Sequence, residues 1–214
     1  MKRLIFLLLP LFLPLLPLAC TPTPTPEQLY RTGDELEAAA KNKRVPRTFE
    51  DFIASPGYRT SRDIWRGRAI EQYNPSGSYV EILLKEQRGR LYINGAIAMD
   101  FPICSGRFGG HETPRGSFRI TQKAKDYRSN LYGSFVNARG DAVKYGVTSS
   151  QTAPAGTRFQ GAPMPYWMRF NGAIGLHVGN VYREGESHGC VRVPEEACSI
   201  LFGKLSVGSR VIVR

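Results

Sequence analysis

Apolar and polar residues alternate through the middle of the chain with the two-residue period of a β-strand. The apolar positions are 80, 82, 84, 91, 93, 97, 99, 101 and 103. Asn94-Gly95 separates two of these segments, and the pair favours a tight hairpin because both residues accept a positive φ. The pattern therefore predicts a three-stranded antiparallel meander over residues 79–104.

Shorter apolar segments predict further elements in the second half of the chain. Strands are expected at 117–121, 173–178, 191–193 and 210–213. Residues 194–202 are expected to form a short helix, with Pro194 at its first position and Gly203 as its stop. Residues 27–43 carry a weaker helical pattern. The stretch 123–161 is longer than a tight loop, and the sequence leaves open whether it forms a lid or a groove wall.

The first 26 residues have the composition of an export signal followed by a spacer. Residues 1–19 have a basic start and a short, proline-interrupted apolar segment, which is typical of a secretory signal peptide. Cys20 stands where the lipobox of bacterial lipoproteins has its acylated cysteine. The alternative is ordinary cleavage near Ala19, which leaves Cys20 as a free thiol. The Thr/Pro repeat within residues 20–26 predicts an extended linker, with a disordered N-terminus as the alternative.

The formal net charge of +11 suits an anionic partner. Export argues against nucleic acid and leaves carboxylate-bearing cell wall or anionic lipid headgroups, with a generally solvated basic surface as the alternative. We expect an exported monomer that is held to a membrane by a lipid anchor. If the cell has an outer membrane, we expect it to face the periplasm.

The number of cysteines points to a reactive thiol. The chain has four cysteines, namely Cys20, Cys104, Cys190 and Cys198. If Cys20 carries lipid, three remain in an oxidising compartment, so at least one thiol stays free. Cys104 and Cys198 either form a disulfide or are buried and unpaired, and we favour the second interpretation.

The segment Ser187-His188-Gly189-Cys190-Val191-Arg192, with His177 before it, supplies the groups of a thiol acyl-transfer site. The Cys190 thiolate would attack a carbonyl while a histidine manages the proton. The N–H groups of His188, Gly189 and Cys190 are candidates for the oxyanion hole. In an extended segment Arg192 would share a face with Cys190 and bind a substrate carboxylate, unless it forms an internal ion pair.

Two other functions fit parts of the same pattern. A zinc hydrolase would use His177, His188 and Cys190 as ligands, but the HExxH motif is missing and a metal-bound thiolate would no longer act as nucleophile. A wall-binding lipoprotein without catalytic activity is the non-enzymatic alternative. A papain-type peptidase is excluded because its cysteine precedes its histidine. We expect neither a cofactor nor a metal.

Three sequence blocks in order resemble the L,D-transpeptidase catalytic domain family, also called YkuD. The blocks are 101–107 (FPICSGR), 113–118 (TPRGSF), and the region from 164–168 (MPYWM) through 174–177 (IGLH) to 187–192 (SHGCVR). The resemblance covers residues 79–214. Residues 27–78 match no family and are interpreted as a partly helical N-terminal extension.

The resemblance implies a mainly β fold, a sandwich of two packed mixed sheets with one short helix after the catalytic motif. It implies a peptidoglycan L,D-transpeptidase that cleaves the L,D bond of a tetrapeptide stem, releases D-Ala and passes the acyl group to an amine. Water as acceptor would make it an L,D-carboxypeptidase. Cys190 would be the nucleophile and His177 the general base, oriented by the carbonyl group of Val178.

The resemblance also implies a set of substrate-binding residues. With Arg192 these are Ser187, Tyr166 and Trp167; Ser187 is also expected to hydrogen-bond within its loop, and core packing is the alternative for Trp167. Cys104 departs from the family pattern, which usually has a small or hydroxyl residue there.

Overall fold

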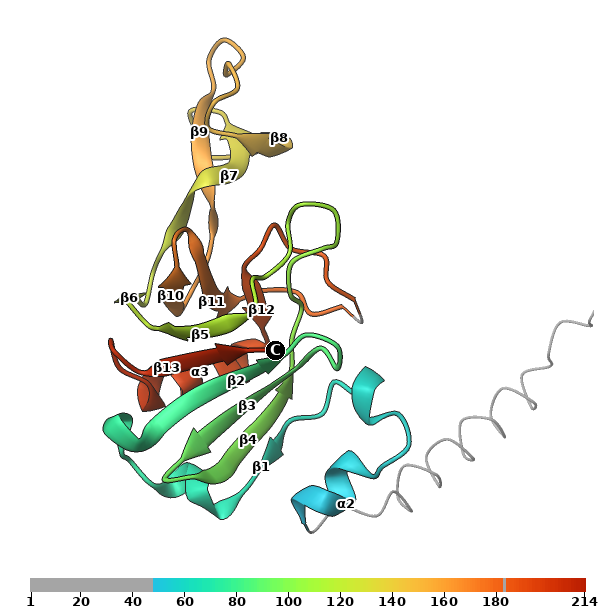
Figure 1. Ribbon diagram of the computed structural model, residues 1–214. Helices are drawn as coiled ribbons and strands as arrows, with labels where there is room; N and C mark the ends of the chain where they lie inside the picture. The colour runs from blue at the N-terminus through green and yellow to red at the C-terminus, as the bar shows by residue number, and fades with distance from the viewer. Residues whose placement is uncertain (1–47, 183) are drawn as a thin grey trace, which may run out of the picture. The chain divides into compact units, whose positions relative to one another are not determined.

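The computed structural model of the protein describes residues 48–182 and 184–214. The predicted signal peptide, the Thr/Pro linker and the helix predicted at 27–43 lie outside these residues. The described elements in chain order are α2 (Phe49–Ile53), the 3-10 helix η1 (Tyr58–Thr60), β1 (Trp65–Arg66), the 3-10 helices η2 (Arg68–Glu71) and η3 (Pro75–Gly77), β2 (Ser78–Leu83), β3 (Arg88–Ile93), β4 (Ala96–Pro102), β5 (Gly116–Arg119), β6 (Gln122–Ala124), β7 (Arg128–Val136), β8 (Ala142–Thr148), β9 (Arg158–Pro163), β10 (Trp167–Asn171), β11 (Ile174–Val178), β12 (Val191–Val193), α3 (Glu195–Lys204) and β13 (Arg210–Val213) (Figure 1).

The first sheet contains the predicted meander. Its six strands lie in the order β1-β4-β3-β2-β13-β5. Strands β2, β3 and β4 pair antiparallel, as the alternation predicted. Asn94 and Gly95 have φ values of 52° and 79°, the left-handed values that this tight turn requires. Strand β13 pairs parallel with β2 and antiparallel with the edge strand β5, so the C-terminal strand is an interior strand of the sheet.

A second sheet packs against the first and encloses the core. Its four strands lie in the order β12-β11-β10-β6. The core side chains of the two sheets and of α3 form one buried cluster, in which Val80 and Leu91 of the first sheet join Leu176 and Val191 of the second. Because β11 and β12 are parallel while β10 and β11 are antiparallel, the sheet is mixed. The predicted mainly β sandwich with one short helix after the cysteine motif is confirmed.

Helix α3 differs at both ends from its prediction. Pro194 is the N-cap rather than the first helical residue, and the helix continues through Gly203 to Lys204. The predicted stop at Gly203 is therefore wrong. Lys123 of β6 accounts for the actual end, because its Nζ donates hydrogen bonds to the carbonyl oxygens of Phe202 and Leu205. A cation at this end also complements the helix dipole.

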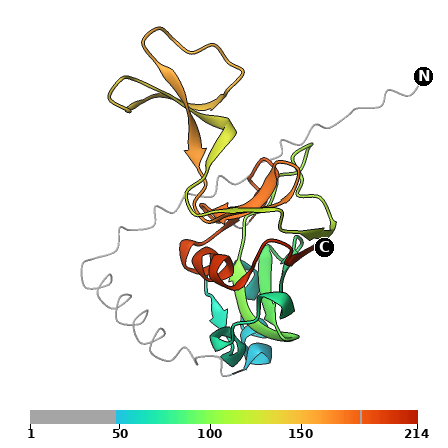
Figure 2. The same ribbon diagram turned by 90° about the vertical axis from the view of Figure 1, so that its left-hand side faces the viewer.

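Residues 128–163 form a third sheet of three strands, in the order β8-β7-β9. In both ribbon views this sheet projects away from the two packed sheets (Figures 1 and 2). Its base, at residues 129–132 and 162–163, lines the cavity that contains Cys190. Of the two interpretations that the sequence left open for residues 123–161, the structure therefore shows a groove wall.

The segment before β2 is tied to the first sheet through a buried arginine. Arg88 of β3 is fully buried and forms an ion pair of 2.6 Å with Asp100 of β4. Its Nη1 donates to the carbonyl oxygen of Ser61, and its Nη2, which also forms the ion pair, donates to the carbonyl oxygen of Asp63. Strand β1 extends the same sheet by pairing with β4. The 27–78 extension therefore contributes a strand and backbone acceptors as well as short helices.

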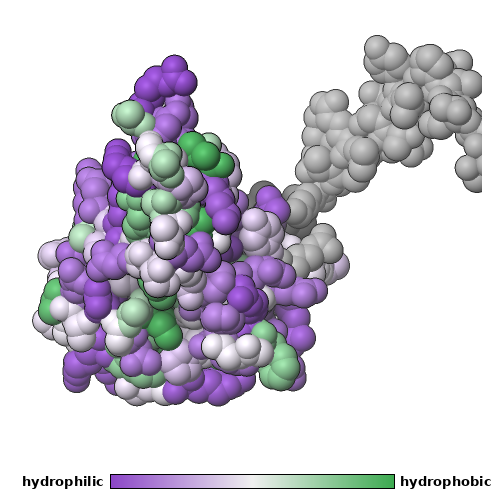
Figure 3. Space-filling view, turned by 90° about the horizontal axis from the view of Figure 1, so that it is seen from above, coloured by the Kyte–Doolittle hydropathy of each residue, from purple (hydrophilic) through white to green (hydrophobic). Residues whose placement is uncertain are grey.

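Figure 3 shows the molecule from above, relative to the view of Figure 1. The face in this view is mostly hydrophilic, with only scattered apolar residues. Within residues 48–182 and 184–214, no helix has both the length and the apolar character needed to cross a membrane.

Candidate active site

Cys190, His177 and Arg192 line one cavity of about 620 Å³. The second sheet, the base of the third sheet and the loop before β12 form its walls. Its other lining residues are Tyr127, Ser129, Asn130, Leu131, Tyr132, Ala162, Pro163, Met164, Trp167, Arg169, Ala173, Ile174, Val178, Gly179, Asn180, Tyr182, Ser187 and His188. The lining contains two arginines and no carboxylate, so the cavity favours an anionic ligand.

The parallel pairing of β11 and β12 brings the catalytic candidates together. His177 and Arg192 are register partners in this ladder, so their side chains project from the same face. Cys190 lies two residues before Arg192 and shares that face. It approaches Gly175, whose backbone hydrogen-bonds to the thiol. Cys190 and His177, thirteen residues apart in the chain, thus line the same cavity.

The imidazole of His177 is buried and held in one orientation. Its Nδ1 lies 2.8 Å from the carbonyl oxygen of Val178, the contact that the family resemblance implies. Because a carbonyl only accepts hydrogen bonds, Nδ1 carries the proton and Nε2 is left as the basic nitrogen. Burial, and secondarily the positive charge of Arg192, lower the pKa of His177 to about 4, against the hydrogen bond to Val178, which raises it. His177 is therefore a neutral base at pH 7.

Burial also keeps the thiol of Cys190 protonated in the resting protein. Desolvation raises the pKa of Cys190, while the backbone of Gly175 and the cations Arg192 and Arg169 partly offset this effect. The Sγ atom lies 3.8 Å from the carbonyl oxygen of Ala173. A neutral thiol beside a neutral imidazole means that the proton must move during attack rather than before it.

The cysteine loop is fixed by two buried hydroxyl groups. Ser187 Oγ donates to the carbonyl oxygen of Cys190 and accepts from the N–H of Gly189 at 3.1 Å. Thr113 Oγ1 donates to the carbonyl oxygen of Gly189 at 2.8 Å and accepts from the N–H of Gly106 at 2.9 Å. The expectation that Ser187 hydrogen-bonds within its loop is therefore confirmed.

The geometry of this loop corrects one predicted role. The N–H of Gly189 is already used by Ser187, so it is not available as an oxyanion donor. The N–H groups of His188 and Cys190 donate to no residue in the described part of the chain. Gly189 is needed for its backbone instead: its φ is +111°, a value that L side chains rarely adopt.

The side chain of His188 links the cysteine loop to the third sheet. Its ring lies 4.4 Å from the ring of Tyr132 in β7 and 4.8 Å from the ring of His111. The guanidinium of Arg107 lies 3.0 Å from its Nε2. Partial burial and this cation lower the pKa of His188. His111 takes part in this cluster.

Arg192 lines the cavity without an acidic partner among the described residues. No ion pair among residues 48–182 and 184–214 involves it, so the structure does not support the alternative of an internal salt bridge. Arg169 of β10 is a second cation in the lining that sequence reasoning missed. Its guanidinium donates to Gln122 and Tyr127 and lies 5.7 Å from the ring of Trp167.

Of the two predicted aromatic residues, only Trp167 lines the cavity. It is almost fully buried and stacks on Tyr127 with ring centroids 4.9 Å apart, so it belongs to both the cavity wall and the interior. Tyr166 is corrected: its side chain packs against the core and lies 5.5 Å from the ring of Phe202 in α3. Its backbone φ of +55° is uncommon for a residue other than glycine.

Cys104 and Cys198 are buried and free, the interpretation that we favoured. Burial raises the pKa of Cys198 to about 12, which keeps it inert. Within the described ranges, no three His, Cys, Asp or Glu side chains are grouped as a metal site requires. The proposed zinc ligands His177 and His188 have their ring contacts with Val178 and with Tyr132, respectively.

The important residues that sequence reasoning missed are Thr113 and Arg169. Thr113 was visible only as part of a family-like block, because the bond to Gly189 joins residues 76 positions apart. Arg169 lies in β10, a strand that the sequence analysis did not predict. The side of the sheet on which its side chain lies could therefore not be predicted. A strand prediction for residues 167–171 would have placed it opposite the buried Met168.

Residues 77–213 match the profile of the L,D-transpeptidase catalytic domain family, YkuD. No curated protein matches the chain. An L,D-transpeptidase from Stackebrandtia nassauensis shares 22% identity, with 67% of this chain and 58% of that chain covered and a TM-score of 0.47.

Two further solved structures are similar to a comparable extent. An L,D-transpeptidase from Mycobacterium smegmatis shares 17% identity over 64% of this chain and 58% of its own, with a TM-score of 0.48. The catalytic domain of the E. faecium L,D-transpeptidase shares 24% identity over 67% of this chain and 99% of its own, with a TM-score of 0.44. The chain thus spans 58% of the length of the first two proteins.

Proposed function

This chain belongs to the L,D-transpeptidase catalytic domain family, and from that premise we propose that it remodels cell-wall peptidoglycan with Cys190 as its nucleophile. The observation that carries the proposal is the shared cavity of Cys190, the neutral base His177 and two arginines without a carboxylate. Those groups suit acyl transfer from an anionic peptide.

The donor in this proposal is a tetrapeptide stem that ends in a diamino acid and D-Ala. Its carboxylates match Arg192 and Arg169, because a guanidinium forms paired, charge-assisted hydrogen bonds with a carboxylate. Trp167 and the base of the third sheet restrict the cavity on one side. These contacts would hold the L,D bond before D-Ala next to Cys190 Sγ.

In acylation, His177 Nε2 takes the thiol proton as Cys190 Sγ attacks the carbonyl carbon of the donor. The N–H groups of His188 and Cys190 stabilise the oxyanion that develops. The C–N bond to D-Ala then breaks, and the proton on His177 passes to the leaving amine. The products are a thioester on Cys190 and free D-Ala.

Deacylation runs through the same groups in reverse. An amine in the cavity attacks the thioester, a new C–N bond forms and the C–S bond breaks, while His177 returns the amine's proton to sulfur. With a diamino-acid side chain as acceptor, the product is a 3–3 crosslink; with a protein lysine, it is a protein attached to the wall. Water as acceptor would make the chain an L,D-carboxypeptidase, the second candidate function.

The location of this activity is proposed from the N-terminal sequence. The chain would be exported as a monomer, acylated at Cys20 and held away from the membrane by the Thr/Pro repeat, facing the periplasm in a cell with an outer membrane. Labelling with a radioactive fatty acid tests the anchor. The label should appear on the full chain and be absent from Cys20→Ala.

Mass spectrometry of defined muropeptides tests the reaction itself. Incubation of the chain with tetrapeptide monomers should yield D-Ala together with 3–3 dimers. Tripeptide without dimers would indicate water as acceptor. If neither product forms, or if Cys190→Ala forms them at the same rate, the proposed function is wrong.

A further inference from the structure

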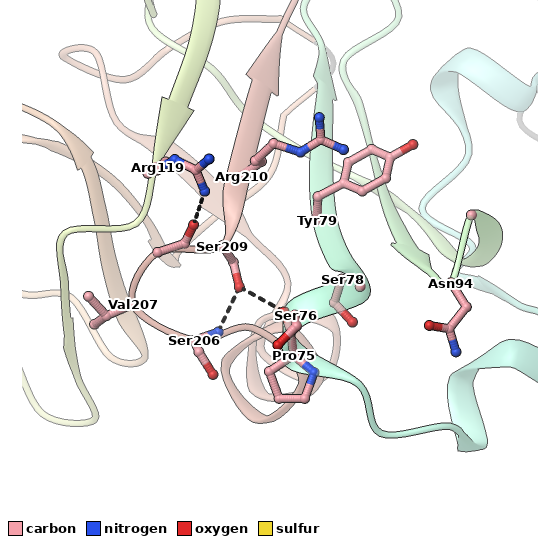
Figure 4. A pocket seen from close by; sticks show the side chains of 13 residues that line it. Pro75, Ser76, Ser78, Tyr79, Asn94, Arg119, Ser206, Val207, Ser209 and Arg210 are labelled. Carbon is pink, nitrogen blue, oxygen red and sulfur yellow. Dashed lines mark hydrogen bonds between the residues drawn. The ribbon is translucent and has the colours of Figure 1, made fainter.

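A second cleft, of about 990 Å³, shares no residue with the cavity of Cys190. It lies where β2 and β13 begin and β5 ends, beside the Asn94-Gly95 turn. Its lining residues are Pro75, Ser76, Gly77, Ser78, Tyr79, Asn94, Gly95, Arg119, Ser206, Val207, Gly208, Ser209 and Arg210. The lining contains two arginines and no acidic residue (Figure 4).

The two arginines are direct neighbours across a strand pair. Arg119 of β5 and Arg210 of β13 are register partners in an antiparallel ladder, and Arg210 is in turn the register partner of Tyr79 in β2. All three therefore project from one face of the first sheet. This is the outer face, because the alternating residues Val80 and Val211 are buried in the core.

Like charges placed directly opposite each other on a sheet are destabilising. The positive charges of Arg119 and Arg210 are not neutralised, since neither arginine forms an ion pair within residues 48–182 and 184–214. One nitrogen of Arg119 donates to the carbonyl oxygen of Gly208 at 2.7 Å, and the guanidinium of Arg210 lies 4.9 Å from the ring of Tyr79. Both side chains are thus oriented while most of their donors stay open.

The wall opposite the arginines is rigid. The backbone N–H of Ser206 donates to Ser209 Oγ at 2.9 Å, and Ser209 Oγ contacts the carbonyl oxygen of Pro75 at 3.4 Å (Figure 4). Gly208 donates its N–H to the carbonyl oxygen of Ile120, which fixes this loop to the end of β5. The cleft therefore needs no large rearrangement to accept a ligand.

We propose that this cleft is a non-catalytic binding site for carboxylate groups of peptidoglycan, with Arg119 and Arg210 as the paired cations. The choice of carboxylate rests on the proposed function, which places a polymer with repeated carboxylates beside the protein. A bound carboxylate relieves the repulsion between the guanidiniums and accepts their open donors. Occupation of this site would hold the polymer to the enzyme and raise its effective concentration at Cys190.

NMR titration of the full chain carrying Cys190→Ala tests the site without turnover. The probes are a disaccharide tetrapeptide with free carboxylates, the same compound with its carboxylates amidated, and inorganic phosphate. The free-carboxylate compound should shift the amide signals of Ser206 to Arg210 and of Arg119, and the amidated compound should not. The added substitutions Arg119→Gln and Arg210→Gln should weaken this response about tenfold.

The matched control is Arg62→Gln with Arg68→Gln, which removes the same charge from exposed positions outside the cleft and should leave the response unchanged. An equal response to the amidated compound, a response to phosphate alone, or no response to any probe overturns the proposal. Thioester formation at Cys190 is measured separately in the unsubstituted chain. Failure of catalysis and failure of the second site therefore give different results.

Discussion

The Nδ1 atom of His177 lies 2.8 Å from the carbonyl oxygen of its own neighbour, Val178. In a Ser-His-Asp arrangement a buried carboxylate orients the imidazole and stabilises its charged form. A carbonyl orients the ring equally well but carries no net charge, so it does less to support an imidazolium. The buried His177 therefore combines a fixed tautomer with a low pKa.

The pH dependence of catalysis should report this environment. The proposed mechanism requires neutral His177, whose pKa is lowered to about 4, whereas an ordinary histidine has a pKa near 6.5. The acid limb of kcat/KM should thus fall near pH 4, and the enzyme should remain active at pH 5.5. A profile of kcat/KM with a small tetrapeptide donor measures this. An acid limb near pH 6.5 would contradict the proposed environment of His177.

The free energy of unfolding should change between about pH 6.5 and pH 4, the range over which the proposed base titrates. The pKa of His177 is lower in the folded than in the unfolded state. Its contribution to the free energy of unfolding is therefore fully present above about pH 6.5 and is lost as the pH falls towards 4. The predicted loss is roughly 3 kcal/mol. Urea unfolding between pH 7 and pH 4 measures it. In His177→Gln the part of the pH dependence that belongs to this group should disappear.

Thr113→Val should slow acylation although Thr113 touches no substrate. The substitution keeps the side-chain volume but removes the hydroxyl that joins Gly106 N–H to the carbonyl oxygen of Gly189. Because the buried carbonyl of Gly189 and the partly buried N–H of Gly106 would lose their partner, we expect a stability loss of about 1–3 kcal/mol and a lower kcat. Thr60→Val is the matched control, since its hydroxyl makes an exposed hydrogen bond to Gly57. If the two variants have the same kcat, Thr113 does not position the loop.

Two glycine-to-alanine substitutions should act differently: one should lower catalytic efficiency, and the other should raise the stability of the fold. Gly189→Ala forces a side chain onto a φ of +111°, with its Cβ 3.3 Å from Ile174, and should reduce kcat/KM at least about tenfold by shifting Cys190. Gly203 lies within α3 with no atom within 4 Å of an added Cβ, so Gly203→Ala should stabilise the fold by about 0.5–1 kcal/mol. Thermal unfolding and turnover of both variants measure these effects. An active Gly189→Ala would show that the loop conformation is not critical.

Asp100→Ala should destabilise the protein strongly. Asp100 is fully buried and accepts hydrogen bonds from Arg88, Arg90 and Tyr58. Its removal leaves the buried guanidinium of Arg88 uncompensated, which typically costs about 3–5 kcal/mol. Asp141→Ala breaks an exposed pair with Arg139 and should change stability by less than about 1 kcal/mol. Equal effects in urea unfolding would rule out a structural role for the buried pair.

Local sequence patterns predicted those parts of the structure that depend on neighbouring residues. The Asn94-Gly95 turn and the strands around it follow from alternation and from the freedom of these residues to take positive φ. The end of α3 was mispredicted because Lys123, which binds the last carbonyl groups, comes from a distant strand. The buried position of Arg88 depends on acceptors at Ser61 and Asp63, which no local pattern reveals.

In the candidate site, too, some features were predicted from the sequence and others depend on contacts that the sequence does not show. The resemblance supplied Cys190 and His177, and the parallel pairing of β11 with β12 explains why they share a cavity. It did not show that Ser187 occupies the N–H of Gly189, because this depends on the loop's hydrogen bonds rather than on residue types. It likewise misplaced the ring of Tyr166, which packs against the core and Phe202, a residue distant in the sequence.

The central claim is that an acyl group is transferred through the sulfur of Cys190. Intact-protein mass spectrometry after mixing the chain with a tetrapeptide donor, without an amine acceptor, tests it most directly. We predict a mass increase equal to the donor minus D-Ala, located by peptide mapping at Cys190 and absent from Cys190→Ala. An adduct on another residue, or full turnover by Cys190→Ala, would contradict the account.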